Sequence, residues 1–467
     1  MSVNEEFLSE HTIAMRKAAV ECQLLLAPFQ RDGTSSSSST TSWVVDLLPE
    51  LANDRTSSTS ASLNERRNKV LTKWKDERHE DNLKAIRYDP NAESSPSSTW
   101  NFRRQFHQNN QPCRIHGLKE SCFRHVNSIW SSPRVFRQWM RRVYPPYGNN
   151  DDGGGGYSYN LPVRRSSTHE TTLDADGRAA ECITINMPLE EYITYLDRQN
   201  AHRSNGETKD YLKDWHLEAF LEDHKLLDSD LYQVPDIFEH DLLNPFLRAF
   251  TKGDYRFVYW GPAGSRTDWH SDVLNSFSWS YNVYGCKEWT FLVPNSNRRQ
   301  IIVQKAGECI FVPATWKHQV VNLEETLSVN RNWLTASNLD LCWNCLTTEI
   351  QSIEKELASW GSHYDWDARE SMLRGCVGLD VTAFYLVILY RLATIEKEVT
   401  SVADRRKLLG PDAAFEVSRC VDTMQTILNE ESLRLEERLA ATLASAEMAQ
   451  AVLRLGRLVF KKIHVSS

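Results

Sequence analysis

The sequence predicts a mainly β core flanked by helices, and two features of the chain support this prediction. Between residues 255 and 333, short segments rich in aromatic and branched residues are separated by turn signals. Many short strands of this kind are typical of an antiparallel jelly roll, a barrel-like sandwich whose interior can hold a site. Beyond about residue 338 the apolar residues recur at helical spacing instead. We therefore expect a β-roll followed by a helical region.

Composition divides the chain into three parts. Residues 1–99 form an extension that is partly helical near its start and carries serine-rich tracts, which bury too little apolar surface to fold. Residues 100–338 form the β domain, and the glycine-rich stretch 149–156 within it is typical of a flexible surface insertion. Residues 339–467 form the helical region, which is interpreted as a bundle or wrap around the barrel, or as a dimerisation surface.

Charge and apolar content exclude several classes of protein. The formal net charge is −8, whereas direct nucleic-acid binding normally shows as a basic face. The longest apolar run, Phe384–Tyr390, is far shorter than the roughly 20 residues that span a bilayer, and the acidic N-terminus lacks a secretory pattern. The ten cysteines are scattered, which favours reduced thiols. We expect a soluble protein of the cytoplasm, with the nucleus as a second compatible location.

The first elements of the β domain follow from local patterns. MPLEEYITYLDRQ, from Met187, has Pro188 in its first turn and an apolar face, which predicts a helix. YLKDWHL, from Tyr211, is a candidate strand. YRFVYWG, from Tyr255, is rich in aromatic and branched residues and predicts a strand that ends at Gly261.

The strand predicted after Asp272 has one apolar side and one polar side. Phe277, Trp279, Tyr281 and Val283 fall on one face, and Ser276, Ser278, Ser280 and Asn282 fall on the other. Gly285 ends this strand, and CKEWTFLVP begins the next one. IIVQKAGECIFVPATWKH supplies two more strands, and TLSVNRNWL alternates in the same way as the first.

The C-terminal part contains one motif with the spacing of a metal half-site. Cys342 and Cys345 in CWNC have the separation found in zinc sites, but no second pair of cysteine or histidine residues lies nearby in the sequence. On a helix the two thiols simply face the same way. We therefore interpret them as structural residues.

A stronger candidate for metal binding lies in the β domain. TDWHSD puts His270 and Asp272 two residues apart, and ATWKHQVV supplies His318. On a strand, side chains at i and i+2 leave the same face, so the first two residues can enter one cavity. Two histidines and one carboxylate, with other positions open, form the ligand set of non-haem Fe(II) oxygenases. An isolated HxD is a weak signal, and a structural histidine is an equally good reading of it.

The neighbouring residues favour the metal interpretation. An Fe(II) ion with three protein ligands has room for a chelating 2-oxo acid and for dioxygen. The far carboxylate of such a co-substrate needs a buried cation, which Lys287 can supply, and neutral donors, which Thr267, Ser280 and Asn330 can supply. Lysine is usually a surface residue. The position of Lys287 between two aromatic strands favours burial.

Four strings carry a resemblance to a known family: YLKDWHL, DYRFVYWGPAGS, SFSWSYNVYGCKEW and GECIFVPATWKHQVVNLEETLSVNRNW. From about residue 102 to residue 333 the chain resembles the JmjC-domain oxygenases and, within that family, the group of jumonji domain-containing protein 4. The resemblance implies a cupin-like double-stranded β-helix. It also implies Fe(II) at His270, Asp272 and His318, and 2-oxoglutarate held by Lys287 with help from Thr267 and Asn330.

The same resemblance implies an activity and a partner. The activity is dioxygen-dependent lysyl hydroxylation of a protein, and the substrate is a translation termination (peptide-chain release) factor. Two alternatives stay open: a histone lysine demethylase on the same fold, and a binding module without turnover. One departure concerns a tyrosine that related enzymes place on an early strand to contact 2-oxoglutarate, because RAAECITINM has no clear counterpart of it. The C-terminal helices are also a candidate surface for homo-oligomers.

Overall fold

The computed structural model describes the greater part of the 467-residue chain. The described residues are 9–27, 84–88, 102–143, 160–165, 183–201, 209–227, 229–238, 240–251, 253–360, 365–398 and 411–464. The glycine-rich insertion at 149–156 and the serine-rich tracts of the N-terminal extension lie outside these residues.

The strands of the described chain are β1 (Ala85–Arg87), β2 (Cys113–His116), β3 (Asn160–Arg165), β4 (Ile183–Pro188), β5 (Tyr211–Trp215), β6 (Arg256–Gly261), β7 (Arg266–His270), β8 (Phe277–Tyr284), β9 (Cys286–Leu292), β10 (Arg299–Lys305), β11 (Cys309–Val312), β12 (His318–Asn322) and β13 (Thr326–Trp333). From Tyr211 onward the strands begin where alternation and turn signals predict them, whereas β1 and β3 were not predicted. Met187 and Pro188, which were expected to begin a helix, instead end a strand, and the helix begins at Leu189.

Within the described residues these strands form two facing sheets, as the fold prediction requires. The larger sheet has the order β1-β2-β11-β8-β13-β6-β5-β3-β4, and the smaller has the order β10-β9-β12-β7. Every pairing except the parallel β1–β2 pair is antiparallel. Trp289 and Phe291 of the smaller sheet pack with Ile310 and Val312 of the larger one in a single buried cluster. The predicted β-roll is therefore confirmed.

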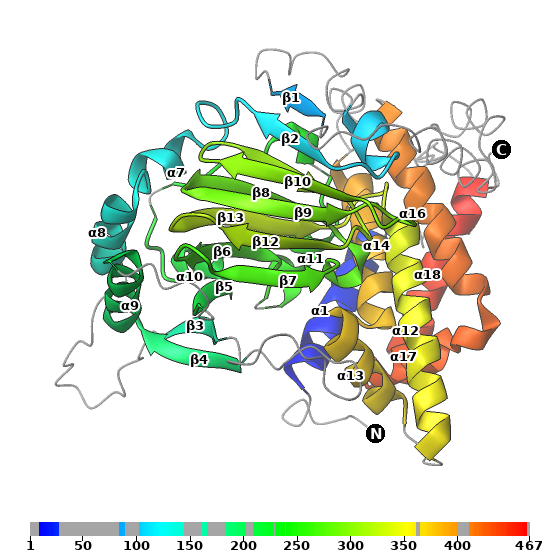
Figure 1. The fold of residues 1–467 in the computed structure, drawn as a ribbon. Helices are drawn as coiled ribbons and strands as arrows, with labels where there is room; N and C mark the ends of the chain where they lie inside the picture. Colours follow the sequence, from blue (N-terminus) through cyan, green and yellow to red (C-terminus); the bar gives the residue numbers. More distant parts are fainter. Residues whose placement is uncertain are drawn as a thin grey trace.

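The helices lie on the outside of the larger sheet and in the C-terminal part (Figure 1). They are α1 (Glu10–Leu25), α7 (Arg124–Ile129), α8 (Pro133–Val143), α9 (Leu189–Ala201), α10 (Leu217–Asp223), α11 (Leu243–Phe250), α12 (Leu339–Trp360), α13 (Trp366–Val377), α14 (Val381–Glu398), α16 (Pro411–Asn429), α17 (Leu435–Thr442) and α18 (Ala446–His464), with short turns η3 (Arg103–His107), η4 (Asp236–Phe238), η5 (Val273–Asn275) and η6 (Glu431–Leu433).

The two faces of β8 differ in polarity. One face packs in an apolar outside layer, and the other is polar and faces the interior. Phe277, Trp279 and Tyr281 are fully buried against the helices that cover the larger sheet. Ser278 and Ser280, on the opposite face, are buried as well and point between the two sheets. Burying hydroxyl groups is costly unless they have partners, so this polar interior marks the place where a ligand can bind.

The N-terminal helix joins the C-terminal helices, although the two are far apart in the sequence. In Figure 1, α1 lies beside α14, and the two helices are in contact. Ala14, Ala18 and Cys22 of α1 belong to the same buried cluster as Leu386 and Leu389 of α14. Small residues on one face of α1 allow this close approach.

The described helices also bear on the membrane question. No single described helix is long and apolar enough to cross a membrane. One pair, α13 with residues 381–395 of α14, meets the length and composition criteria only when taken together, and it is bent by 74° at the break.

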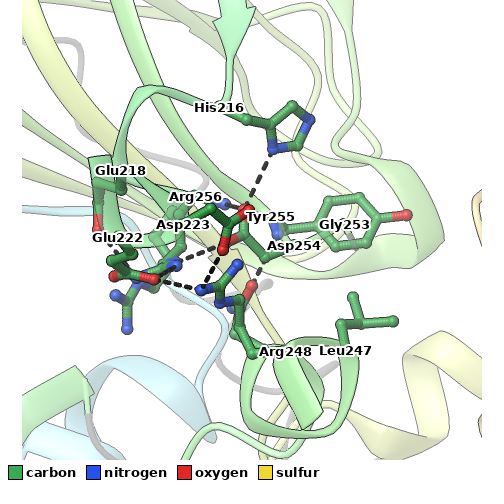
Figure 2. A network of polar contacts seen from close by, with 12 residues as sticks. His216, Glu218, Glu222, Asp223, Leu247, Arg248, Gly253, Asp254, Tyr255 and Arg256 are labelled. Atoms are coloured by element: carbon green, nitrogen blue, oxygen red, sulfur yellow. Dashed lines mark hydrogen bonds and ion pairs between the residues drawn. The ribbon is translucent and has the colours of Figure 1, made fainter. Parts of the chain in front are cut away.

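A network of buried charges fixes the start of β6 next to α10 and α11 (Figure 2). The Arg256 guanidinium donates to Asp254 at 2.7 Å and to both oxygens of Glu222 at 2.6 and 2.8 Å. Glu218 lies 3.3 Å from the same guanidinium, and His216 contacts Asp254 from the other side at 3.1 Å. Because one planar cation satisfies several carboxylates, the network holds the first residue of β6 in place.

Candidate metal centre

The two candidate histidines lie opposite each other on neighbouring strands. His318 is the first residue of β12 and pairs in register with His270, the last residue of β7. Their ring centroids are 4.3 Å apart. Cross-strand partners point to the same face of a sheet, so both rings enter the space between the two sheets.

Asp272 reaches the same place by a different route from the one the sequence predicts. The strand prediction assumed that His270 and Asp272 share one strand face, but β7 ends at His270 and Asp272 instead precedes the turn η5. Its carboxylate accepts a hydrogen bond of 2.6 Å from Ser278 Oγ on β8. The chain therefore turns after the histidine, and a hydroxyl group of the opposite sheet orients the carboxylate.

One ligand atom from each of His270, Asp272 and His318 lies within 4.8 Å of the other two, the arrangement that could hold a metal ion. His270 Nδ1 lies 2.7 Å from the carbonyl oxygen of Asp268, and His318 Nδ1 lies 3.0 Å from that of Trp316. A carbonyl oxygen can only accept, so each Nδ1 carries the proton and each Nε2 keeps its lone pair. The donor set therefore fits a divalent ion of the Fe(II) type.

His318 is kept in the neutral form that metal binding requires. Burial, the largest cause, lowers the pKa of His318 to about 4, although the nearby Asp272 carboxylate opposes the shift. The rings of Trp289 and Phe291 lie 5.7 and 5.6 Å from the imidazole, centroid to centroid. These aromatic rings also keep water away from one side of the centre.

Lys287 is the buried cation that the sequence predicts beside this centre. It is 2% exposed, and its Nζ donates to Ser328 Oγ at 2.6 Å. Within the described residues no acidic side chain forms an ion pair with it, and burial lowers the pKa of Lys287 to about 7. A buried ammonium with only a hydroxyl partner fits the far carboxylate of 2-oxoglutarate.

The three predicted neutral donors are distributed over three strands. Thr267 on β7 pairs with Val320 and so faces the space between the sheets. Asn330 on β13 is 7% exposed and donates to Ser328, the partner of Lys287. Ser280 on β8 is 2% exposed, and its Oγ has no hydrogen-bond partner among the described residues. A buried hydroxyl without a partner is free to donate a hydrogen bond to a bound ligand.

Two tyrosines lie near Lys287 and were not singled out in the sequence. The Tyr259 ring on β6 lies 5.7 Å from Lys287 Nζ. Tyr211 on β5 is 4% exposed, lies 6.0 Å from the Tyr259 ring, and packs so closely over Gly261 that a Cβ there would come within 2.4 Å of it. Both strands were predicted, and alternation along them could have revealed that these rings share the inner face.

Cys342 and Cys345 do not form a metal site with other described residues. Both lie on α12, where Cys342 is fully buried in the helical core. Each of the nine cysteines in the described part of the chain is a free thiol. The structural interpretation of CWNC is therefore the one that fits.

Comparisons with known proteins agree with this geometry. A family model described as JmjC domain, hydroxylase, matches residues 298–333. The chain is 32% identical over 296 residues to the 2-oxoglutarate and iron-dependent oxygenase JMJD4 of Danio rerio, which covers 53% of this chain and 69% of that protein. The chain belongs to the JMJD4 family of JmjC-domain oxygenases. Iron and 2-oxoglutarate are therefore its cofactor and co-substrate.

Other relatives of this JMJD4 family member carry similar or different descriptions. The JMJD4 oxygenase of Homo sapiens is 33% identical over 280 residues, which is 52% of this chain and 66% of that protein. A protein of Arabidopsis thaliana called arginine-specific demethylase JMJ20 is 36% identical over 230 residues, or 39% of this chain and 48% of that protein. The names of these relatives thus state two different activities, an iron-dependent oxygenase and an arginine-specific demethylase.

Proposed function

We propose that this dioxygenase hydroxylates a lysine side chain of a protein, and that the protein is a translation termination (release) factor in the cytoplasm. In this proposal His270, Asp272 and His318 bind the iron, and Lys287 binds the far carboxylate of 2-oxoglutarate with Thr267, Ser280 and Asn330. The observation that carries it is the convergence of three ligand atoms between the sheets, together with a buried ammonium on β9 that has no acidic partner among the described residues.

The residues of the chain orient the reactants and keep water out. Iron with 2-oxoglutarate and dioxygen supplies the oxidising power: one oxygen atom enters a C–H bond of the substrate, and the other ends in succinate as carbon dioxide is lost. The carbonyls behind both histidines hold the rings in one orientation, and Ser278 does the same for Asp272. Ser328 holds the Lys287 ammonium by a hydrogen bond, and this ammonium would bind the co-substrate carboxylate.

Mass spectrometry of the release factor tests this proposal. The chain, Fe(II) and 2-oxoglutarate are incubated with the purified factor, and we expect a lysine to gain the mass of one oxygen atom. His270→Ala removes a metal ligand and should abolish both the mass gain and the succinate that depends on the factor. His125→Ala, at an exposed histidine of α7, is the matched control and should leave both unchanged. If the chain binds both iron and 2-oxoglutarate but leaves the release factor unmodified, the release factor is not its substrate.

Demethylation is a second candidate, because one relative at 36% identity is called an arginine-specific demethylase. Hydroxylation of an N-methyl group gives an unstable product that loses formaldehyde, whereas hydroxylation of a side-chain carbon gives a stable product. Formaldehyde release from methylated peptides, without a stable gain of oxygen on unmethylated ones, would favour this candidate over lysyl hydroxylation.

A further inference from the structure

Strand β5 carries an irregularity that turns two charged side chains toward the interior. Leu212 pairs with Trp260 and Trp215 pairs with Val258, so Lys213 and Asp214 together face the single residue between these partners. Asp214 has a φ of +57°, a left-handed conformation that is rare outside glycine. Extra residues of this kind commonly redirect side chains beside active sites. Leu212 and Trp215 point into the apolar layer, so the two charged residues turn the other way.

One carboxylate oxygen of Asp214 is tied to the co-substrate pocket. Tyr259 Oη donates to Asp214 Oδ1 at 2.8 Å. The same tyrosine ring lies 5.7 Å from Lys287 Nζ. The Asp214 carboxylate is thus separated by one aromatic ring from the proposed 2-oxoglutarate site, and it is held there by a hydrogen bond.

Within the described part of the chain, the partners of the other carboxylate oxygen are two cations at long distances. Arg164 Nη2 lies 3.4 Å from Asp214 Oδ2, and Lys213 Nζ lies 3.8 Å from it. The Asp214 side chain is 33% exposed and that of Lys213 is 22% exposed, so both can be reached from solvent. An ammonium group of the chain itself is therefore held loosely beside the Asp214 carboxylate.

We propose that Asp214 Oδ2 anchors the ammonium group of the target lysine, and that Lys213 occupies this position until the substrate displaces it. The inference rests on the proposed lysyl hydroxylation and names the residue that selects the charge of the substrate. One lysine ammonium replaces another, so Asp214 keeps its compensating charge throughout. Partly exposed ion pairs are weak, which makes such an exchange easy. A neutral side chain cannot replace Lys213 without leaving Asp214 less compensated.

Binding of two matched peptides tests the anchor. One is a release-factor peptide that the enzyme hydroxylates, and the other carries Nε-acetyl-lysine at the same position. Their affinities are measured without oxygen, in the presence of Fe(II) and 2-oxoglutarate. Asp214→Asn preserves shape but removes the charge, so we expect binding of the lysine peptide to weaken about ten-fold or more, as expected for loss of a hydrogen bond to a charged group. Binding of the acetylated peptide should change little, so the preference between the two peptides should collapse.

Two further variants separate an anchor from a structural role. Asp210→Asn removes one negative charge just before the same strand, where the carboxylate pairs with Arg165 at 2.7 Å, and it should keep the preference for the lysine peptide. Lys213→Gln removes the competing ammonium and should lower the KM for the lysine peptide. In Asp214→Asn the KM for 2-oxoglutarate should rise less than the KM for the peptide, whereas collapse of the pocket would raise both equally.

The possible failures can be told apart. If the wild-type enzyme modifies no lysine, lysyl hydroxylation is rejected, and the proposal that Asp214 anchors the target lysine is rejected as well. If the wild type hydroxylates lysine but Asp214→Asn keeps its full preference for the charged peptide, lysyl hydroxylation stands and the Asp214 anchor is wrong. A higher KM in Lys213→Gln would contradict the displacement step.

Discussion

Burial disfavours the charged form of Lys287, yet this charged form is the one proposed to bind 2-oxoglutarate. Removing an ammonium from water disfavours its charged form, which is why burial lowers the pKa of Lys287 to about 7. Among the described residues its hydrogen-bond partner is the Ser328 hydroxyl, and the Tyr259 ring lies 5.7 Å from its Nζ. A ligand carboxylate placed next to it would favour the charged form again. Binding of 2-oxoglutarate should therefore be coupled to the protonation of this side chain.

We predict that 2-oxoglutarate binding takes up a proton above about pH 7. With a lowered pKa, the free lysine is mostly neutral at pH 8, whereas the bound lysine is charged, so affinity should fall as pH rises further, by up to about ten-fold per pH unit. Calorimetry at pH 8 in two buffers of different ionisation enthalpy measures the uptake. The arginine in Lys287→Arg keeps its charge at every pH, so this variant should show no proton uptake at this position. Equal heats in both buffers for the wild type would contradict the coupling.

Other residues of the site show what sequence reasoning can and cannot find. Lys287 was predicted because its position between two aromatic strands favours burial, and the co-substrate carboxylate needs a buried cation. Ser278 was predicted only as part of a polar strand face, and its bond to Asp272 depends on how the two sheets meet. Tyr259 was within a predicted strand, but its proximity to Lys287 again requires the register between distant strands.

At the scale of elements, alternation predicts strands well and their irregularities poorly. The polar and apolar faces of β8 and β13 follow the period of two. The same rule failed for Asp272, because a strand was assumed to continue through a position where the backbone turns. It also does not reveal the irregular pairing of β5, in which Asp214 adopts a left-handed conformation without being glycine.

The charge network of Figure 2 predicts a large loss of stability when its centre is removed. Arg256→Met leaves the buried Asp254 carboxylate without its guanidinium partner and removes one of the cations near Glu218, which should lower the free energy of unfolding by about 3–5 kcal/mol. Arg248→Met is the matched control, because Arg248 pairs with the more exposed Glu222 at 2.6 Å and Asp223 at 3.5 Å, and exposed ion pairs are weak, so it should cost less than about 1 kcal/mol. Urea denaturation measures both. Equal losses would show that Arg256 does not organise the network.

At the scale of the whole molecule, the helical region supports the metal centre rather than standing apart. Leu274, two residues after Asp272, is buried in the helical core. Asn275 donates to the carbonyl oxygen of Leu341 on α12 at 3.1 Å. The turn that carries one proposed iron ligand is thus anchored on the C-terminal helices. Helical spacing predicted these helices, but not this contact, because it joins segments more than 60 residues apart. Oligomer formation through these helices stays a prediction.

Iron content measures the central claim most directly. The chain is loaded with Fe(II) and 2-oxoglutarate without oxygen, freed of excess metal, and analysed for iron and for secondary structure by circular dichroism. We predict one iron per chain in the wild type, and almost none in His318→Ala and Asp272→Ala, with unchanged helix and strand content in both variants. Retention of one iron per chain in both variants, at wild-type affinity, would contradict the assignment of these residues as ligands.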